Sequence, residues 1–176
     1  RMKMTENQHS LQFDTLALHG GQSPPDSATK SRAVPIYMTS SYVFDDTEHA
    51  ASLFKMQEAG YIYSRNANPT NAVFEERLAK LEGGIGAFAV SSGQAALTVA
   101  LLTLAKAGDE LISTNALYGG TYNLFAETFK RFCVDVHFVD GTDFSAIEGK
   151  INEKTKAIFT ETIGNPNLEI ADLTKL

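Results

Sequence analysis

The chain has 176 residues, a formal net charge of −6, and a composition that is 43% hydrophobic and 20% charged. This size and mixture are typical of a water-soluble globular domain with its own core. The fifteen basic residues are scattered rather than gathered into a stripe, so we expect no nucleic-acid partner. The apolar stretches are interrupted and shorter than a bilayer crossing, and we expect no membrane partner.

Cysteine and histidine usage narrows the chemistry further. Cys133 is the single cysteine, which excludes an internal disulfide and, with the lack of an apolar leader at the N-terminus, predicts a cytoplasmic location. We expect its thiol to be buried and inert between Phe132 and Val134. The histidines lack the spacing of metal ligands, with each other or with the cysteine, so we predict no metal site. They are His9, His19, His49 and His137.

The N-terminal third has little regular pattern. Residues 1–7 are polar and predicted to be disordered, and glycine and proline repeatedly interrupt residues 11–60. We predict brief extended pairings over residues 34–37 and 40–44, and a short helix over residues 46–57 with Asp46 or Thr47 as its N-cap. Such a long irregular arm is unusual inside a compact domain, so we expect it to lie across a neighbouring subunit or a second domain.

A polar and aromatic loop precedes the next predicted helix. Asn68 and Pro69 suit its N-cap and first turn, and the helix should end at Gly83. Tyr63 and Arg65, two residues apart, would project to the same side of an extended segment. The pair suits a phosphate or carboxylate clamp, and a surface arginine beside a packing tyrosine is the alternative.

The remainder alternates between strand and helix patterns, which predicts an α/β fold with a mainly parallel sheet flanked by helices. Ligands of such sheets bind beyond the carboxyl ends of the strands, where three loops should meet: residues 91–94, 116–121 and 162–167. The strands are predicted over residues 85–90, 110–114, 134–139 and 157–161, and the helices over residues 94–106, 121–132 and 144–152.

Each of these loops carries a candidate binding group. Gly93 and Gln94 lie where a strand turns into a helix, so their amides can hold a phosphate, although tight packing also explains small residues there. Tyr118 precedes two glycines and can stack on a flat ring or serve in acid/base chemistry, and a packing tyrosine is the alternative. Glu161 ends a strand, and Asn165 precedes a proline in what is otherwise an ordinary turn.

Several separated motifs, in this order, resemble the pyridoxal-phosphate (PLP) enzymes of cysteine and methionine metabolism, and within that family the O-acetylhomoserine sulfhydrylases. The similarity runs from residue 13 to the last residue. It implies the aspartate aminotransferase-like fold of PLP enzymes, fold type I, left incomplete because family members are more than twice as long. The motifs are Leu18–Gln22, Arg32–Tyr37, Tyr42–Ala50, Asn68–Asn71 and Glu161–Pro166.

The resemblance also implies domains and site residues. Residues 1–60 would be an arm that contacts a neighbouring subunit, and residues 61–176 the first part of the large PLP-binding domain. The backbone amides of two residues would hold the PLP phosphate, and a tyrosine and an arginine would reach the phosphate of a neighbouring subunit's cofactor. These residues are Gly93 and Gln94, and Tyr63 and Arg65, respectively.

The remaining implied roles concern the cofactor ring. Tyr118 would stack on the pyridine ring and assist proton transfer, as the catalytic residue of this chain. Asn165 would lie near the ring's 3-hydroxyl and the substrate carboxylate, with Glu161 as a supporting residue and Ser92 shaping the phosphate turn.

The activity implied by the resemblance is a PLP-dependent γ-replacement in methionine biosynthesis, which converts O-acetylhomoserine and sulfide to homocysteine and acetate. Family members are homotetramers, dimers of dimers with shared active sites. Methionine γ-lyase and cystathionine γ-synthase are alternatives, because the phosphate site does not select the nucleophile. The resemblance places the PLP lysine, which follows a Ser-x-Thr context in family members, beyond the last residue of this sequence. A non-catalytic fragment, or an unrelated phosphate-binding module, is therefore a further alternative.

Overall fold

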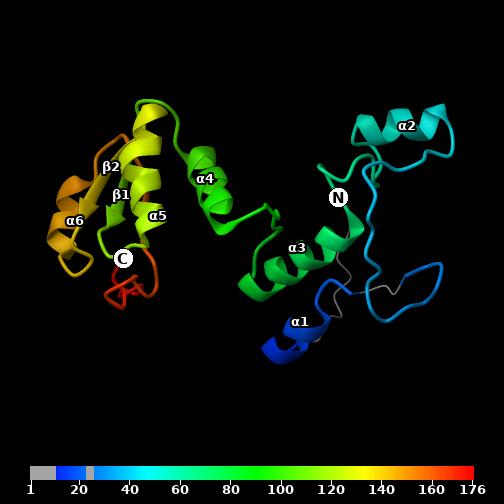
Figure 1. The fold of residues 1–176 in the computed structure, drawn as a ribbon, viewed down its shortest axis with the longest axis horizontal. Coiled ribbons are helices and arrows are strands. Elements are labelled where there is room, and N and C mark those ends of the chain that lie inside the picture. Colours follow the sequence, from blue (N-terminus) through cyan, green and yellow to red (C-terminus); the bar gives the residue numbers. More distant parts are fainter. Residues whose placement is uncertain (1–10, 23–25) are drawn as a thin grey trace. The chain divides into compact units, whose positions relative to one another are not determined.

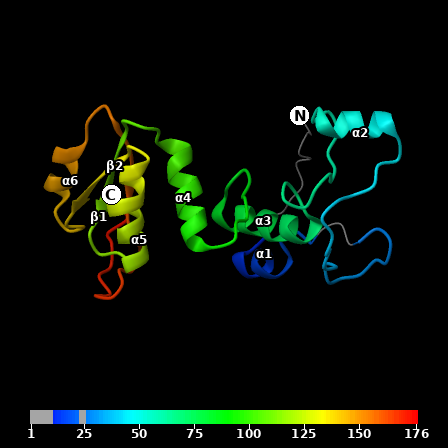
Figure 2. The ribbon, with the colours of Figure 1, turned by 45° about the horizontal axis from the view of Figure 1, so that its top comes forward.

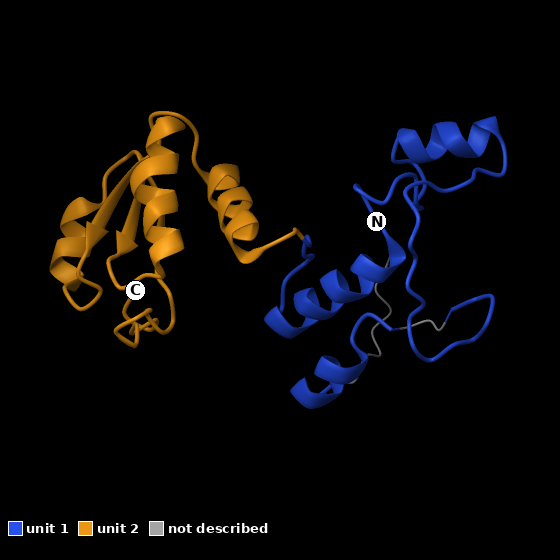
Figure 3. Cartoon of the chain, in the orientation of Figure 1, with its two compact units in different colours: residues 1–89 blue, residues 90–176 orange. Residues whose placement is uncertain are grey.

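The computed structural model describes residues 11–22 and 26–176. Residues 1–7, which are predicted to be disordered, and His9 lie outside the described residues. The chain divides into two compact units, unit 1 with residues 1–89 and unit 2 with residues 90–176 (Figure 3). The predicted division at residues 60 and 61, which concerns contact with a neighbouring subunit, stays a prediction.

Unit 1 contains helices α1 (Phe13–His19), α2 (Thr47–Phe54) and α3 (Pro69–Glu82), joined by irregular segments. Helix α1 falls in the region predicted to be irregular, and it lies beside α3 (Figures 1 and 2). The Arg77 side chain donates from Nε to the carbonyl of Gly20, 2.8 Å away. Because α1 is only seven residues long and buries none of them, it leaves no apolar periodicity to detect.

Helix termini in unit 1 follow the predicted chemistry. The Asp46 side chain caps α2 by accepting from the His49 amide at 2.7 Å, and Asn68 caps α3 by accepting from the Thr70 amide at 2.9 Å. Gly83 ends α3 in the left-handed region, with φ 66°, where glycine is favoured. These predictions are confirmed.

The arm pairs less than predicted. Ser41 forms an isolated antiparallel bridge with Tyr63, which accounts for the expected pairing of residues 40–44. Residues 34–37 form no strand; instead the Tyr37 amide donates to the Thr70 hydroxyl at 2.9 Å, which ties the arm to the start of α3.

The strand predicted over residues 85–90 is wrong. This segment has no strand partner in the described part of the chain, and the side chains of Ile85 and Phe88 are exposed. The amide of Ala89 donates to the Glu75 carboxylate at 2.8 Å rather than to a neighbouring strand. An apolar run indicates that side chains tend to be buried, whereas a strand also needs a neighbouring strand to form hydrogen bonds with its backbone.

Unit 2 is built on a parallel sheet with the strand order β2-β1-β3, so the predicted α/β fold is confirmed (Figure 1). In the ladder, Leu111 of the central strand lies between Val136 and Ala157. Strand β3 begins and ends two residues before the predicted range, and the helix predicted near residues 121–132 is α5 followed by a π-helical segment, η1. The elements are α4 (Gly93–Leu104), β1 (Glu110–Thr114), α5 (Gly119–Asn123), η1 (Leu124–Phe129), β2 (Asp135–Val139), α6 (Phe144–Lys150) and β3 (Thr155–Phe159).

Helices cover both faces of this sheet. Leu111 packs on one face with Leu101 of α4 and Phe129 of η1, whereas its neighbour Ile112 packs on the other face with Ile147 of α6. Figures 1 and 2 accordingly show α5 and α6 on opposite sides of the strands. Successive residues of a strand point to opposite faces, so β1 contributes to both cores and is buried almost throughout.

Cys133 corrects the prediction of a buried thiol. It is exposed in a turn with φ 57°, where its amide donates to the carbonyl of Lys130 and its own carbonyl accepts from Gly108. The turn leaves the thiol at the surface and sends the next residue, Val134, into the core. The apolar neighbours predicted burial because the sequence pattern does not reveal this turn.

Two further observations bear on the expected partners. None of the helices in residues 11–22 and 26–176 is long and apolar enough to cross a membrane. Within the same residues, His, Cys, Asp and Glu side chains form no group of three or more that is placed to hold a metal ion. The expected absence of metal and membrane partners stays a prediction.

Candidate functional site

The N-terminus of α4 offers free amides to an anion. Ser92 caps the helix, its hydroxyl oxygen accepting from the Ala95 amide at 3.1 Å, as expected of a residue that shapes the turn. No acceptor among the described residues takes the amides of Gly93 and Gln94. A Cβ placed on Gly93 would meet nothing within 4 Å, so the approach is open. These amides, at the positive end of the helix dipole, fit a phosphate group.

The second loop fixes Tyr118 through its backbone. Strand β3 ends at Phe159, so Glu161 lies two residues beyond the strand that it was predicted to end. The Tyr118 amide donates to both of its carboxylate oxygens, at 3.2 and 3.1 Å, so the segment after β3 holds the start of α5. The ring lies over Gly120, where an added Cβ would come within 2.4 Å of a ring carbon. About half of Tyr118 is exposed (52%), which leaves a ring face free for stacking.

The third loop packs directly against the second. A Cβ on Gly164 would lie 2.8 Å from the carbonyl oxygen of Ala116, so the two backbones touch and only glycine fits. Asn165, next along the chain, is exposed beside this contact. The loop that carries Asn165 therefore lies against the loop that carries Tyr118.

A hydrogen bond also joins the first loop to the second. The Gln94 side chain donates from Nε2 to the hydroxyl of Thr121 at 3.2 Å, and Thr121 is buried on α5, with 2% exposed. The structure thus brings together the three loops that the sequence predicted to meet. Sequence reasoning missed Thr121, and its one signal is a polar residue a helical turn after Tyr118.

Tyr63 and Arg65 lie together in unit 1. The Arg65 guanidinium is 5.4 Å from the centre of the Tyr63 ring, and both residues are exposed. A turn brings them together, with the amides of Asn66 and Ala67 donating to the Tyr63 carbonyl, so the expectation of an extended segment is wrong. Their predicted role at a phosphate stays a prediction.

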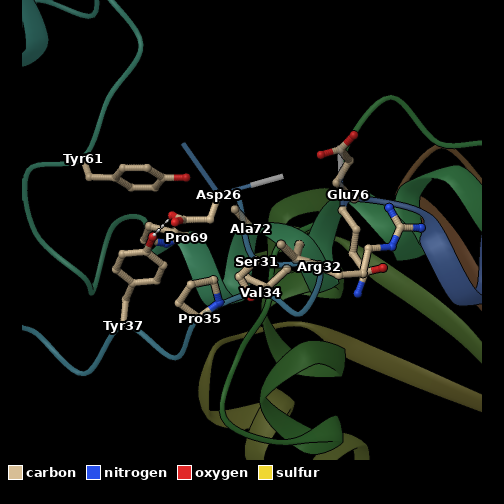
Figure 4. Close-up of a pocket in the computed structure, with 13 residues that line it drawn as sticks. Asp26, Ser31, Arg32, Val34, Pro35, Tyr37, Tyr61, Pro69, Ala72 and Glu76 are labelled. Carbon is tan, nitrogen blue, oxygen red and sulfur yellow. Dashed lines mark hydrogen bonds between the residues drawn. The ribbon is translucent and has the colours of Figure 1, made fainter. Parts of the chain in front are cut away.

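Unit 1 also contains a pocket of about 220 Å³ between the arm and the start of α3 (Figure 4). Tyr37, Asp26 and Arg32, which line it, are already paired within the chain. Tyr37 donates its hydroxyl to Asp26 at 3.1 Å, which raises the pKa of Tyr37, and Arg32 lies 2.9 Å from a ring nitrogen of His19. The free amides and the exposed ring of unit 2 are the better cofactor site.

Unit 2 thus has a parallel sheet with helices on both faces, and near the carboxyl ends of its strands lie the free amides of α4 and the exposed ring of Tyr118. This is the arrangement in which α/β domains bind the phosphate group of a ligand. The model of the family described as Cys/Met metabolism PLP-dependent enzyme matches residues 14–176. The chain belongs to this family.

Relatives with known names agree with this assignment. The homocysteine synthase of Schizosaccharomyces pombe is 54% identical over 171 residues, which are 97% of this chain and 39% of that protein. The homocysteine/cysteine synthase of Saccharomyces cerevisiae is 53% identical over 93% of this chain and 37% of its own length. The chain therefore spans about two fifths of the length of these relatives.

A solved structure from Campylobacter jejuni is similar to the chain, with a TM-score of 0.88 and 42% identity over 94% of this chain and 40% of the other. It is described as an O-acetylhomoserine (thiol)-lyase and contains an N'-pyridoxyl-lysine-5'-monophosphate. The fold type I prediction is confirmed for the part of the fold that this chain contains. PLP is likewise confirmed as the cofactor of the family.

Proposed function

We propose that the full-length protein containing this chain is a PLP-dependent enzyme that converts O-acetylhomoserine and sulfide to homocysteine and acetate. The names of the relatives support this activity. The structural observation that supports it most directly is the pair of free amides at Gly93 and Gln94, joined through Gln94 and Thr121 to the helix that follows Tyr118.

In this proposal the site residues of unit 2 have separate roles. When bound, PLP supplies an electron sink for the negative charge that develops on the substrate carbons. Gly93 and Gln94 would hold its phosphate through their amides. Tyr118 would support the ring, and its hydroxyl can hold or pass a proton.

The third loop would complete the site. The amide side chain of Asn165 suits the ring's 3-hydroxyl and the substrate carboxylate, because it offers both a donor and an acceptor. The Glu161 carboxylate is already engaged with the Tyr118 amide, so it would support the tyrosine rather than touch the cofactor.

We propose a homotetramer, a dimer of dimers in which Tyr63 and Arg65 reach the phosphate held by a neighbouring subunit. The support lies in the arm, where Met38 and Val43 expose more than nine tenths of their surface (94% and 96%). Exposed apolar residues that lie close together in the chain, as these do, suit a surface that another subunit covers. A cytoplasmic location agrees with Cys133 being the single, unpaired cysteine.

Two assays of the full-length protein test this function. The first measures homocysteine and acetate formed from O-acetylhomoserine and sulfide, with and without added PLP, and we expect PLP-dependent formation of both. The second is the intact mass after borohydride reduction, which should increase by one reduced PLP per chain. A protein that retains PLP but forms no homocysteine would contradict the proposed reaction.

A second candidate function is cysteine formation from sulfide and the shorter acetylated amino acid, O-acetylserine. The Saccharomyces cerevisiae relative, named a homocysteine/cysteine synthase, favours it. Running the same assay with O-acetylserine in place of O-acetylhomoserine, and comparing kcat/KM, separates the two. A ratio that favours O-acetylserine would make cysteine synthesis the main activity.

A further inference from the structure

We propose that Thr121 is a positioning residue, which couples the phosphate-binding turn to the tyrosine that faces the cofactor ring. The inference rests on the proposed function, because it assumes that PLP binds between Gly93 and Tyr118. It adds a residue that would touch neither the cofactor nor the substrate.

The first link joins Thr121 to the phosphate turn. Its hydroxyl accepts from the Gln94 side chain at 3.2 Å, while the Gln94 carbonyl accepts from the Thr98 hydroxyl at 2.8 Å. Gln94 is thereby bonded at both its side chain and its carbonyl, whereas its amide has no acceptor among the described residues. These bonds hold the turn in the orientation that points the amide outward.

The second link joins Thr121 to Tyr118. Both belong to one helical turn, in which the Tyr122 amide donates to the Tyr118 carbonyl at 3.0 Å, and the Glu161 carboxylate holds the Tyr118 amide from the other side. A shift of Thr121 therefore moves the backbone that carries the tyrosine ring. Because Thr121 is almost completely buried, water cannot readily replace its bond to Gln94.

The two links together pre-organise the site. The phosphate amides and the ring support are fixed relative to one another before a ligand arrives, so less ordering is needed on binding. Removing the Thr121 hydroxyl should weaken PLP binding by about two- to tenfold, the range for one lost neutral hydrogen bond. It should also change the angle between ring and tyrosine.

The experiment titrates PLP into the PLP-free full-length protein and records the dissociation constant and the circular dichroism of the bound cofactor. Thr121→Val, which keeps the shape and removes the hydroxyl, should show weaker binding and altered dichroism. Thr121→Ser, which retains the hydroxyl, should restore both. Thr103→Val is the matched control, because its exposed hydroxyl bonds only the Val99 carbonyl of the same helix, and it should behave as the wild type.

The partner of the bond provides a second variant. Gln94→Met removes the donor, should weaken binding as Thr121→Val does, and should add little to it in the double variant. It decides the question if Thr121→Val fails to fold. Wild-type binding and dichroism in whichever of these variants folds would overturn this inference alone. A wild-type protein that takes up no PLP would overturn the proposed function and this inference with it.

Discussion

The two units differ in what holds them together. Unit 2 has apolar cores on both faces of its sheet, around Leu111 and Ile112. In the described part of unit 1, by contrast, the buried apolar residues are Leu53 and Ala79. The parallel sheet is held by its two apolar cores, whereas the arm of unit 1 is held mainly by local hydrogen bonds.

Polar bonds around one asparagine replace a core at the start of α3. The Asn68 side chain accepts from the Thr70 amide and donates to the Tyr37 carbonyl and the Ser64 hydroxyl, with all three distances at 2.9 Å. Thr70 in turn donates its hydroxyl to the carbonyl of Pro35. The arm is thus attached to α3 by hydrogen bonds rather than by apolar packing.

The largest expected effect lies in the core of unit 2. Phe129→Ala removes a ring with no exposed surface and should lower the free energy of unfolding of unit 2 by about 3–5 kcal/mol. Hydrogen exchange of the β1 amides in the full-length protein measures it. Phe132→Ala, three residues away at a half-exposed ring, is the control and should cost far less. Equal losses would contradict the assignment of the core.

A smaller effect is expected where the second and third loops meet. Gly164→Ala places a methyl group against the Ala116 backbone and should destabilise unit 2 by about 1–3 kcal/mol. It should also weaken PLP binding, since it separates the Asn165 loop from Tyr118. Gly149→Ala, in α6, is the matched control: its methyl group would meet nothing within 4 Å, and thermal unfolding should show an unchanged or slightly raised Tm.

In unit 1 the corresponding test concerns the hydrogen bonds of the Asn68 side chain. Asn68→Ala removes a helix cap and leaves two partners unpaired, so a loss of about 1–3 kcal/mol in local stability is expected. Asn68→Asp keeps the cap acceptor but loses the donors, so its local stability should lie between those of the wild type and Asn68→Ala. Exchange of the amides near Tyr37 reports the effect, and unchanged protection in both variants would show that apolar contacts hold the arm.

The smallest effect is a pH dependence of the stability of unit 2, which arises at Glu110, at the amino-terminal end of β1. Hydrogen bonds from Asn152 and His137 lower the pKa of Glu110, so the ionised form is favoured in the folded protein. The stabilisation is complete above the pKa that Glu110 has in the unfolded chain, and is lost as the pH falls through the lower pKa of the folded state. Glu110→Gln should therefore flatten the decline in Tm at acidic pH, and a wild-type slope in this variant would refute the assignment.

The sequence predicted the features that depend on neighbours along the chain. The caps at Asp46 and Asn68 and the parallel pairing of strands separated by helices all follow from short-range chemistry and chain connection. It could not predict features that need a distant partner. Residues 85–90 have a strand's composition but no partner among the described residues, and the bond from Gln94 to Thr121 joins residues 27 positions apart. The turn that exposes Cys133 is a third such case.

The most direct test is a crystal structure of the full-length protein with PLP bound. We expect the phosphate to accept hydrogen bonds from the amides of Gly93 and Gln94, and the pyridine ring to lie against Tyr118. Arg65 and Tyr63 of a neighbouring subunit should reach the same phosphate. A phosphate bound away from the N-terminus of α4, with Tyr118 out of contact with the ring, would contradict the proposed site.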